Sequence, residues 1–538
     1  MAHKTLVGGT AYNVAGGRSM VSGTVYNVAG GRTLVGGTGY NISFYKPIYV
    51  MLYSSGNMVF QKGNNITNGE TLEYFYVDES DFKNTNYEIV DFQTSNVPWW
   101  SQKYNLKNIR FNVQLMPYSI ANWFCYATNL INVNYINLDI NNIVNMYNAF
   151  SHCYNLISNP ICGKNVINMC NTYTGCENIV GTPICGPSVI NMYSTYYYCS
   201  NLTGNPVCGN NVTDMYYTYY SCQNLTGNPV CGLNVTKFGG AYSRCINLTG
   251  SPVCGPNVTS MYETYRDCYK LTGNPVCGNK VTLMTGAYRN CTNLTGSPVC
   301  GSKVTSMSNT YANCTNLTGS PVCGPNVTNM SEAYANCIKL TGSPVCGPNV
   351  IKFDNAYYNC QKLTGYAITG GMVSNMTYAF YNCIRLSGVN PIERSVTNMS
   401  HAFENCTNLT GSVDFGFSKD ISYAFANCSK ITGVPNISPY ATNMQYTYRN
   451  CKNLSAGNIY IISNNIANAK GCFMGKNNSR RYNIHIYPNS TTWNTFLINN
   501  TASIVGKALT WTKGNATYYY NRTYNIYIYG NTSMITPP

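Results

Sequence analysis

One cysteine recurs every 23 residues through the middle of this 538-residue chain, from Cys153 to Cys406. A second cysteine series with the same step runs from Cys162 to Cys346. A repeat period of about 20 to 50 residues is typical of a solenoid, in which each coil covers the hydrophobic edge of the coil before it. We therefore expect one long stack of coils rather than several globular domains.

Each repeat carries the same set of residues that are expected to face inward. In the unit NLTGSPVCGPNVTNMSEAYANC, glycine and proline bend the chain around a short extended Pro-Val-Cys run. Met330, Tyr334 and Cys337 follow at spacings of four and three, which predicts one face of a single helical turn. Leu340 opens the next unit and closes that face. The expected fold is thus a repeat solenoid with short β-strands plus one helical turn per 23-residue coil.

The stacking of coils also indicates whether the 26 cysteines form disulfide bonds. Cysteines of one column lie one coil apart and point the same way, which is a poor arrangement for a disulfide bond. A buried free cysteine behaves as a small hydrophobic residue. Reduced core thiols are therefore expected, and whether any cysteine is disulfide-bonded stays open.

Segments with other patterns flank the periodic region. Residues 1–44 contain a 14-residue repeat with Gly-Gly reversals, in which Tyr12, Tyr26 and Tyr40 are equally spaced. This pattern predicts short β elements, which either form a small β-meander or an oligomerising β-prism element, or anchor the chain to a larger assembly. Residues 45–120 are predicted to be a β-rich module, 121–455 the solenoid, and 456–538 a β-rich cap over the last coil.

The charge pattern argues against several kinds of partner. Charged residues make up 9% of the chain, and the net charge of +15 is spread thinly without a basic block. We therefore expect no nucleic-acid partner. No stretch approaches the roughly 20 apolar residues of a spanning helix, and the start of the chain lacks a signal-peptide pattern. We expect no membrane insertion, and synthesis in a cytosol without export by a recognisable leader.

The residues needed for catalysis are sparse. The four histidines are His3, His152, His401 and His485, and none has a partner at catalytic spacing. His152 and His401 are expected at variable positions on the predicted helical turns. No CxxC zinc knuckle and no phosphate-binding glycine loop occurs. We predict no enzymatic activity, no catalytic residues, no metal and no cofactor.

Outward-facing columns of a solenoid are where recognition is expected. Tyrosine is rigid and amphipathic, so a tyrosine patch suits a glycan or a protein partner. The alternative is compositional, because 49 tyrosines must lie somewhere. A second column of lysine and arginine, from Lys270 to Lys430, either attracts anionic polymer or keeps the surface soluble. The candidate binding residues are Tyr193, Tyr197, Tyr198, Tyr216, Tyr217, Tyr220 and Tyr262.

The repeats VTNMSEAYANCIKL, VSNMTYAFYNCIRL and VTNMSHAFENCTNL resemble the BspA-type leucine-rich repeat family, over residues from about 121 to 455. Members of that family are mostly surface proteins of bacteria and protists that bind host proteins or other cells, and similar arrays occur in phage virion proteins. The N-terminal GGTxYN repeats are similar to those at the start of structural proteins from phages of Firmicutes.

These resemblances imply a non-enzymatic phage virion structural protein. It is expected to be a tail-associated or head-decorating appendage, homo-oligomeric in the particle and attached to other virion proteins through its N-terminal repeats. The solenoid then contacts a glycan or protein on the host surface. The alternatives are a bacterial cell-surface adhesin of the BspA type and, third, a glycan-degrading enzyme, which needs a cleft with paired carboxylates.

Overall fold

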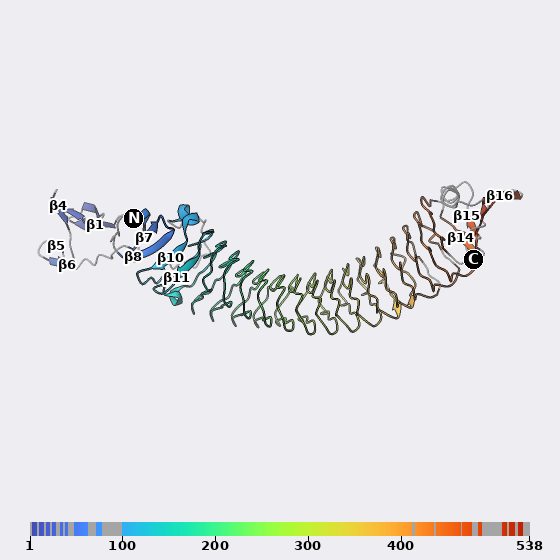
Figure 1. Ribbon diagram of the computed structural model, residues 1–538, viewed down its shortest axis with the longest axis horizontal. Helices are drawn as coiled ribbons and strands as arrows, with labels where there is room; N and C mark the ends of the chain where they lie inside the picture. Colours follow the sequence, from blue (N-terminus) through green and yellow to red (C-terminus); the bar gives the residue numbers. More distant parts are fainter. Residues whose placement is uncertain are drawn as a thin grey trace.

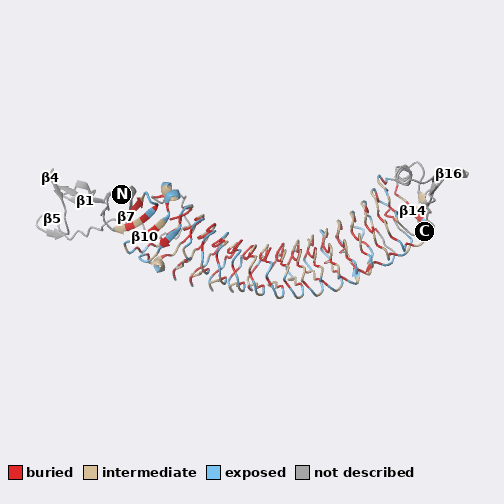
Figure 2. Cartoon of the chain, viewed as in Figure 1, coloured by how far each residue is buried: buried red, intermediate tan, exposed pale blue. Residues whose placement is uncertain are grey.

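The structure is a computed structural model that describes residues 48–62 and 99–475, with gaps at 369, 412–414, 435–436 and 464, together with β9 and the strands at both ends of the chain. The chain forms a long arc of stacked coils (Figure 1). Buried residues follow the inside of every coil, and exposed residues follow its outer turns (Figure 2). The hydrophobic core is therefore one continuous column along the arc.

Neighbouring coils are joined by parallel backbone hydrogen bonds. An isolated β-bridge links each coil to the next at the residue before the Met or Phe column, as between Asn329 and Lys352. In the same coil, Met330 N donates to Lys352 O and Tyr334 N donates to Ala356 O, both at 2.9 Å. Between residues 145 and 443, the described strands are β12 (Tyr366–Ala367) and β13 (Gly388–Val389), which pair in parallel.

The predicted helical turn is wrong: reverse turns occupy its place in the described coils. Ala333 N donates to Met330 O and Cys337 N donates to Tyr334 O, each at 3.0 Å. Asn336, inside the second turn, has a φ of 61°. An α-helix needs negative φ throughout, so a left-handed residue at every fourth position cannot belong to one. A series of turns produces the same spacing of four and three.

Asparagine occupies the second left-handed position of every coil from Asn290 to Asn450 and forms a ladder that the sequence analysis missed. Asn336 Nδ2 donates to Asn313 Oδ1 at 2.8 Å, and Asn359 Nδ2 donates to Asn336 Oδ1 at 3.0 Å. Asparagine tolerates this backbone conformation better than most residues. The sequence pattern that could have revealed this ladder is the recurring asparagine directly before the cysteine of the first column. The ladder runs from Asn290 to Asn382 and from Asn405 to Asn450.

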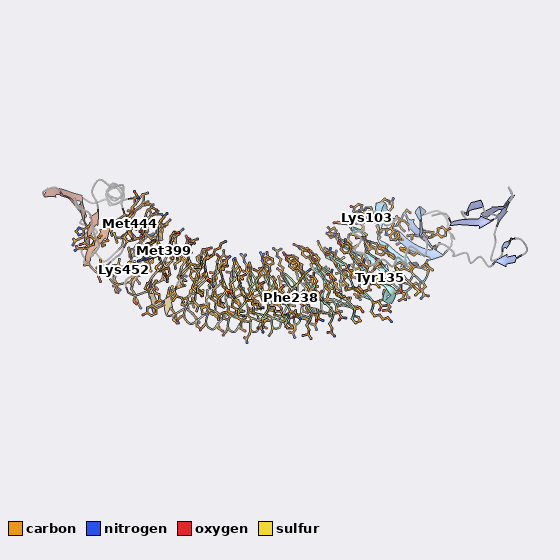
Figure 3. All side chains as sticks on the ribbon, turned by 180° about the vertical axis from the view of Figure 1, so that it is seen from behind. Lys103, Tyr135, Phe238, Met399, Met444 and Lys452 are labelled. Carbon is orange, nitrogen blue, oxygen red and sulfur yellow. The ribbon has the colours of Figure 1, made fainter. Side chains whose placement is uncertain are left out.

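The predicted core columns are buried as expected. Met330, Tyr334 and Cys337 have exposed fractions of 0%. The rings of Tyr334 and Tyr357, one coil apart, stack with centroids 5.3 Å apart and planes 6° from parallel. Side chains fill the arc along its length, and Phe238 lies near its middle (Figure 3).

Every cysteine of the chain lies in the described region and is a free thiol. The thiol of Cys337 donates to the carbonyl oxygen of Tyr311 in the preceding coil at 3.1 Å, and buried cysteines of the first column repeat this bond from Cys153 to Cys451. The second column is half-buried, and burial raises the pKa of Cys346 to about 12. Most of these thiols therefore act as apolar filling rather than as reactive groups.

The described strands at the N-terminal side continue into the coils. A five-stranded sheet has the order β11-β10-β8-β7-β9, and β10 lies parallel to both β8 and β11. Strand pairing therefore continues across residue 120, where the sequence analysis placed a boundary. The bounds are β7 (Ile48–Tyr53), β8 (Asn57–Lys62), β9 (Thr71–Val77), β10 (Asn108–Phe111) and β11 (Asn132–Asn134), with short 3-10 helices η3 (Trp100–Asn105) and η4 (Ile140–Asn142).

Trp99 packs this sheet onto the first coil. Its side chain is 2% exposed, its Nε1 donates to Trp123 O at 2.6 Å, and its ring lies edge-on to Phe60 with centroids 5.5 Å apart. The neighbouring Trp100 faces outward instead, with Lys103 Nζ 3.3 Å from the centre of its ring. Of these two tryptophans, Trp99 therefore makes the packing contact between the sheet and the first coil.

Further strands lie at the two ends of the chain. Three antiparallel hairpins pair β1 (His3–Val7) with β2 (Thr10–Val14), β3 (Arg18–Val21) with β4 (Thr24–Asn27), and β5 (Thr33–Val35) with β6 (Thr38–Tyr40). A second five-stranded sheet has the order β14-β15-β18-β17-β16, from β14 (Gly457–Ile461), β15 (Tyr482–Ile486), β16 (Ala508–Lys513), β17 (Ala516–Asn521) and β18 (Ile526–Gly530). The side chains of the 14-residue repeats lie outside the described residues. Across the part of the chain that was searched, no helix is both long enough and apolar enough to cross a membrane.

Candidate binding surface

The predicted tyrosines lie on one outer surface of the coils. The residues one, two, five and six places after the Met or Phe column residue of each coil form one side of the stack, which we call the turn face; most of them are half-buried or buried. Tyr216 and Tyr217 hold the first two positions of one coil, and Tyr220 holds the fifth. Because coils stack in register, side chains at equal positions meet their neighbours from the next coil.

Ring contacts join six of the seven predicted tyrosines into one patch. Tyr197 and Tyr220 stack with centroids 4.8 Å apart and planes 17° from parallel. Tyr217 lies edge-on to both, with centroids 6.0 Å from Tyr197 and 5.4 Å from Tyr220. The first tyrosine cluster, so defined, comprises Tyr193, Tyr197, Tyr198, Tyr216, Tyr217 and Tyr220.

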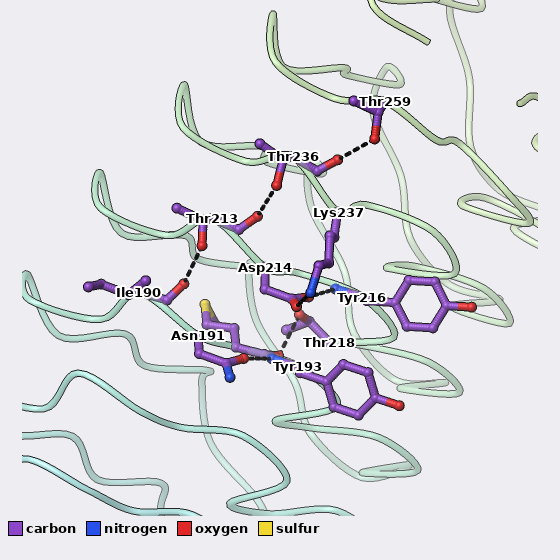
Figure 4. A network of polar contacts seen from close by, with 11 residues as sticks. Ile190, Asn191, Tyr193, Thr213, Asp214, Tyr216, Thr218, Thr236, Lys237 and Thr259 are labelled. Atoms are coloured by element: carbon purple, nitrogen blue, oxygen red, sulfur yellow. Dashed lines mark hydrogen bonds and ion pairs between the residues drawn. The ribbon is translucent and has the colours of Figure 1, made fainter. Parts of the chain in front are cut away.

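Backbone turns fix the rings at one edge of this cluster. Asn191 Oδ1 accepts from Tyr193 N at 2.8 Å, and Asp214 Oδ1 accepts from Tyr216 N at 3.0 Å (Figure 4). The two rings stack with centroids 5.8 Å apart. Lys237 Nζ lies 2.9 Å from Asp214 Oδ2, so the carboxylate is held by its own coil and by the next one. The rings therefore project from a fixed backbone.

The seventh residue, Tyr262, is separated from the first tyrosine cluster by one coil. That coil has glycine, Gly239 and Gly240, at its first two turn-face positions. A Cβ on Gly239 would lie 2.8 Å from the Tyr216 ring, and one on Gly240 would collide with the Tyr217 ring. The two glycines therefore make room for the rings of the preceding coil. Tyr262 is half-buried on the far side of this glycine coil.

The phenols of Tyr197, Tyr217 and Tyr220 are neutral hydrogen-bonding groups. Burial raises the pKa of Tyr197, Tyr217 and Tyr220 above the ordinary value of a phenol. At neutral pH each hydroxyl can therefore both donate and accept. Rigid rings with neutral hydroxyls suit sugar hydroxyls and apolar sugar faces better than they suit ions.

Arginines continue the turn face beyond the cluster, which the sequence analysis did not identify. The Arg244 guanidinium lies 5.7 Å from the centre of the Tyr220 ring. Arg266 pairs with Glu263 at 2.8 Å and with Asp267 at 3.4 Å. These charges are therefore largely neutralised within the protein.

A shallow groove lies on a different side of the coils. Its threonines belong to a column whose hydroxyls bond to the preceding coil, as Thr236 Oγ1 does to Thr213 O and Thr259 Oγ1 does to Thr236 O, both at 3.2 Å (Figure 4). Its lining contains no carboxylate, so it lacks the acid and base that glycoside hydrolysis needs. The groove has a volume of about 500 Å³ and is lined by Lys303, Thr305, Asn326, Thr328, Asn349, Ile351 and Met372.

The histidines differ from expectation in two respects. His401 Nδ1 lies 2.5 Å from Glu404 Oε2, although the sequence analysis found no partner for it. Both His401 and His152 sit at left-handed turn positions, with φ of 57° and 61°, rather than on helical turns. Burial lowers the pKa of His152, and its ring stacks on Tyr126 with centroids 4.5 Å apart. Among the described residues, no group of three or more His, Cys, Asp or Glu could hold a metal ion.

Two members of the predicted basic column, which runs from Lys270 to Lys430, form hydrogen bonds with the preceding coil. Lys339 Nζ donates to Asn316 Oδ1 and Lys430 Nζ donates to Asn408 Oδ1, both at 2.6 Å. These contacts join exposed side chains of neighbouring coils. They add to the regular polar surface of the stack.

A parallel stack of 23-residue coils, most of them with a buried leucine at the same position, is a solenoid of the leucine-rich-repeat type. Residues 349–480 match the family model of the BspA type leucine-rich repeat region in six copies, and this part of the chain is a repeat array of that type. The chain is also similar to a leucine-rich repeat protein from Eubacterium ventriosum of known crystal structure, with 16% identity and a TM-score of 0.28 over 80% of this chain and 94% of that one. No curated protein matches the chain.

Proposed function

We propose that this chain is a non-enzymatic binding protein whose solenoid displays the first tyrosine cluster to a glycan or protein on a cell surface. The observation that carries the proposal is the fixed set of stacked and edge-on rings at Tyr197, Tyr217 and Tyr220. Exposed aromatic patches with neutral hydroxyls are a common basis of recognition. The BspA-type repeats at residues 349–480 are in keeping with an adhesin-like role.

Two settings are proposed for this display. In the first, the chain is an appendage of a phage virion, head-decorating or tail-associated, homo-oligomeric and attached through residues 1–44. In the second, it is a bacterial cell-surface adhesin. The repeat family favours the second setting, and the resemblance of the GGTxYN repeats supports the first. Deletion of residues 1–44 is expected to abolish incorporation into particles in the first setting and to leave the solenoid folded in both.

The binding role is tested by replacing Tyr197 and Tyr220 with alanine. We expect the doubly substituted protein to bind less to an array of oligosaccharides and to intact bacterial cells. Tyr269, which is 43% exposed and lies outside the turn face, provides the matched control as Tyr269→Ala. Equal binding by all three proteins would show that the first tyrosine cluster is not the contact surface.

A further inference from the structure

The arrangement of three rings in the first tyrosine cluster occurs a second time on the turn face. Tyr358 and Tyr381 stack with centroids 4.9 Å apart and planes 7° from parallel. Tyr378 lies edge-on to both, with centroids 6.2 Å from Tyr358 and 5.6 Å from Tyr381. The corresponding distances in the first cluster are 4.8, 6.0 and 5.4 Å. We call the two sets the first triad (Tyr197, Tyr217, Tyr220) and the second triad (Tyr358, Tyr378, Tyr381).

The two triads hold equal positions in their coils. Tyr358 follows Tyr197 by 161 residues, which is seven repeats of 23, and the other two pairs have the same separation. All six rings are half-buried. In no other pair of neighbouring coils does the sequence place tyrosine at both fifth positions. Since the coils stack in register, both triads lie on the same side of the arc.

Each edge-on ring is supported from the following coil. The Tyr217 ring lies over Gly240, where a Cβ would collide with it. The Tyr378 ring stacks on His401, with centroids 4.4 Å apart and planes 8° from parallel. His401 is in turn held by Glu404 and stacks on Tyr423. Both triads are thus fixed before any ligand arrives, which lowers the entropic cost of binding.

The turn face between the triads is polar but carries no strong field. Its arginines face nearby acids: Arg244 and Arg266 lie 3.8 and 3.4 Å from Asp267, and Arg266 also pairs with Glu263. Arg289 adds one positive charge to this face, and Glu332 and Asp354 add two negative charges. The other positions there hold Tyr262, glycines, alanines and residues with hydroxyl or amide side chains. Hydroxyl and amide groups between two aromatic sites suit an uncharged polymer of sugars.

We infer that the solenoid is bivalent and binds one uncharged linear polysaccharide along its axis, with a sugar on each triad. This inference rests on the proposed binding role of the first tyrosine cluster. The triads are on the order of 34 Å apart, from seven coils at ~4.8 Å each. A single sugar cannot reach both, whereas one polymer chain lies along the face and engages both at once. Linking two such contacts raises the affinity for a polymer by about 10²- to 10⁴-fold over that for a short fragment.

The experiment compares polymers with short fragments on the full-length chain. The probes are laminarin, mannan and dextran as uncharged polysaccharides, their trisaccharide fragments, and hyaluronan as an acidic polymer. One variant combines Tyr197→Ala with Tyr220→Ala, another combines Tyr358→Ala with Tyr381→Ala, and a third carries all four changes. The matched control combines Tyr269→Ala with Tyr440→Ala, because these side chains are 43% and 50% exposed and belong to neither triad.

We expect an uncharged polymer to bind the wild type with little dependence on salt, and its fragment to bind at two sites per chain. Either double variant should bind the fragment at one site with unchanged affinity and lose at least about tenfold in polymer affinity. The quadruple variant should bind neither probe. Urea unfolding and the conservative Tyr197→Phe and Tyr358→Phe changes separate a loss of the ring from a loss of folding.

Three results contradict the inference. One fragment site per wild-type chain, or equal affinity for polymer and fragment, overturns bivalency and leaves the proposed binding role intact. Preference for hyaluronan, weakened by salt, overturns the uncharged ligand. Failure of the wild type to bind any of these fragments or polymers overturns both the inference and a glycan-binding role for the first tyrosine cluster.

Discussion

The phenol of Tyr334 crosses the interior of its own coil and binds both backbone groups of Val322. Its Oη donates to Val322 O at 2.6 Å and accepts from Val322 N at 3.0 Å. The same pair of bonds recurs in every coil that has tyrosine in the aromatic column from Tyr173 to Tyr357. These coils are also the ones with a second-column cysteine, since Cys162 to Cys346 stand eleven residues before those tyrosines. Coils with phenylalanine, such as that of Phe380, lack that cysteine.

Tyr334→Phe is expected to destabilise the solenoid by about 1 to 3 kcal/mol, because it leaves the buried N–H and C=O of Val322 without their partner. Urea unfolding followed by circular dichroism measures the change. Tyr269→Phe removes an exposed hydroxyl and should stay within about 0.5 kcal/mol of the wild type. If the two variants unfold at the same urea concentration, the phenol does not satisfy the coil backbone.

Asn336 combines a left-handed backbone with two ladder bonds, and two substitutions separate these contributions. Asn336→Gly keeps the backbone free of strain and should cost about 1 to 3 kcal/mol for the two lost amide bonds. Asn336→Ala should cost a further 1 kcal/mol or more, on the order of the penalty for a Cβ at positive φ. Equal losses of unfolding free energy would show that the backbone strain is negligible.

The thiols predict a loss of stability at alkaline pH. Burial raises the pKa of Cys162 to about 11 and that of Cys346 to about 12 in the folded chain. An unfolded cysteine ionises near pH ~8.5, so above that pH the unfolded state binds fewer protons than the folded state. The stabilising contribution is therefore complete below about pH 8.5 and falls as the pH rises toward the folded values.

Thermal unfolding between pH 7 and 11 measures this effect. We expect the midpoint to be flat up to about pH 8.5 and then to fall. In the same range, native thiols should react slowly with iodoacetamide and unfolded ones quickly. A midpoint that rises with pH would mean that relief of the net positive charge, +15 at pH 7, outweighs thiol ionisation.

Trp99→Ala should loosen the N-terminal end of the stack. The ring is 2% exposed, and its loss is expected to cost about 3 to 5 kcal/mol. In a solenoid each coil contacts only its neighbours, so hydrogen exchange should speed up near Phe124 and fade toward the centre. Trp100→Ala, at a partly exposed site, should change exchange little. Uniformly faster exchange along the whole stack would contradict this local coupling.

Only part of the binding surface could be predicted from the sequence. Tyr197 and Tyr220 stand 23 residues apart, so their meeting followed from the period. The second triad has the same spacing and was missed, although a helical turn and a reverse turn both bring Tyr378 close to Tyr381. The pairing of His401 with Glu404, also three residues apart, was equally open to prediction.

The sequence by itself determined the stack and its core. Identical residues at intervals of 23 must lie above one another once the coils are in register, which placed Met330, Tyr334 and Cys337 in the interior. Only the tertiary structure decided the path of the backbone between them. A helical turn and a series of reverse turns give the same spacing, and hydrogen bonds between stacked coils, together with left-handed residues such as Asn336, select the turns. Those bonds exist only after neighbouring coils have come together, so no single repeat encodes them.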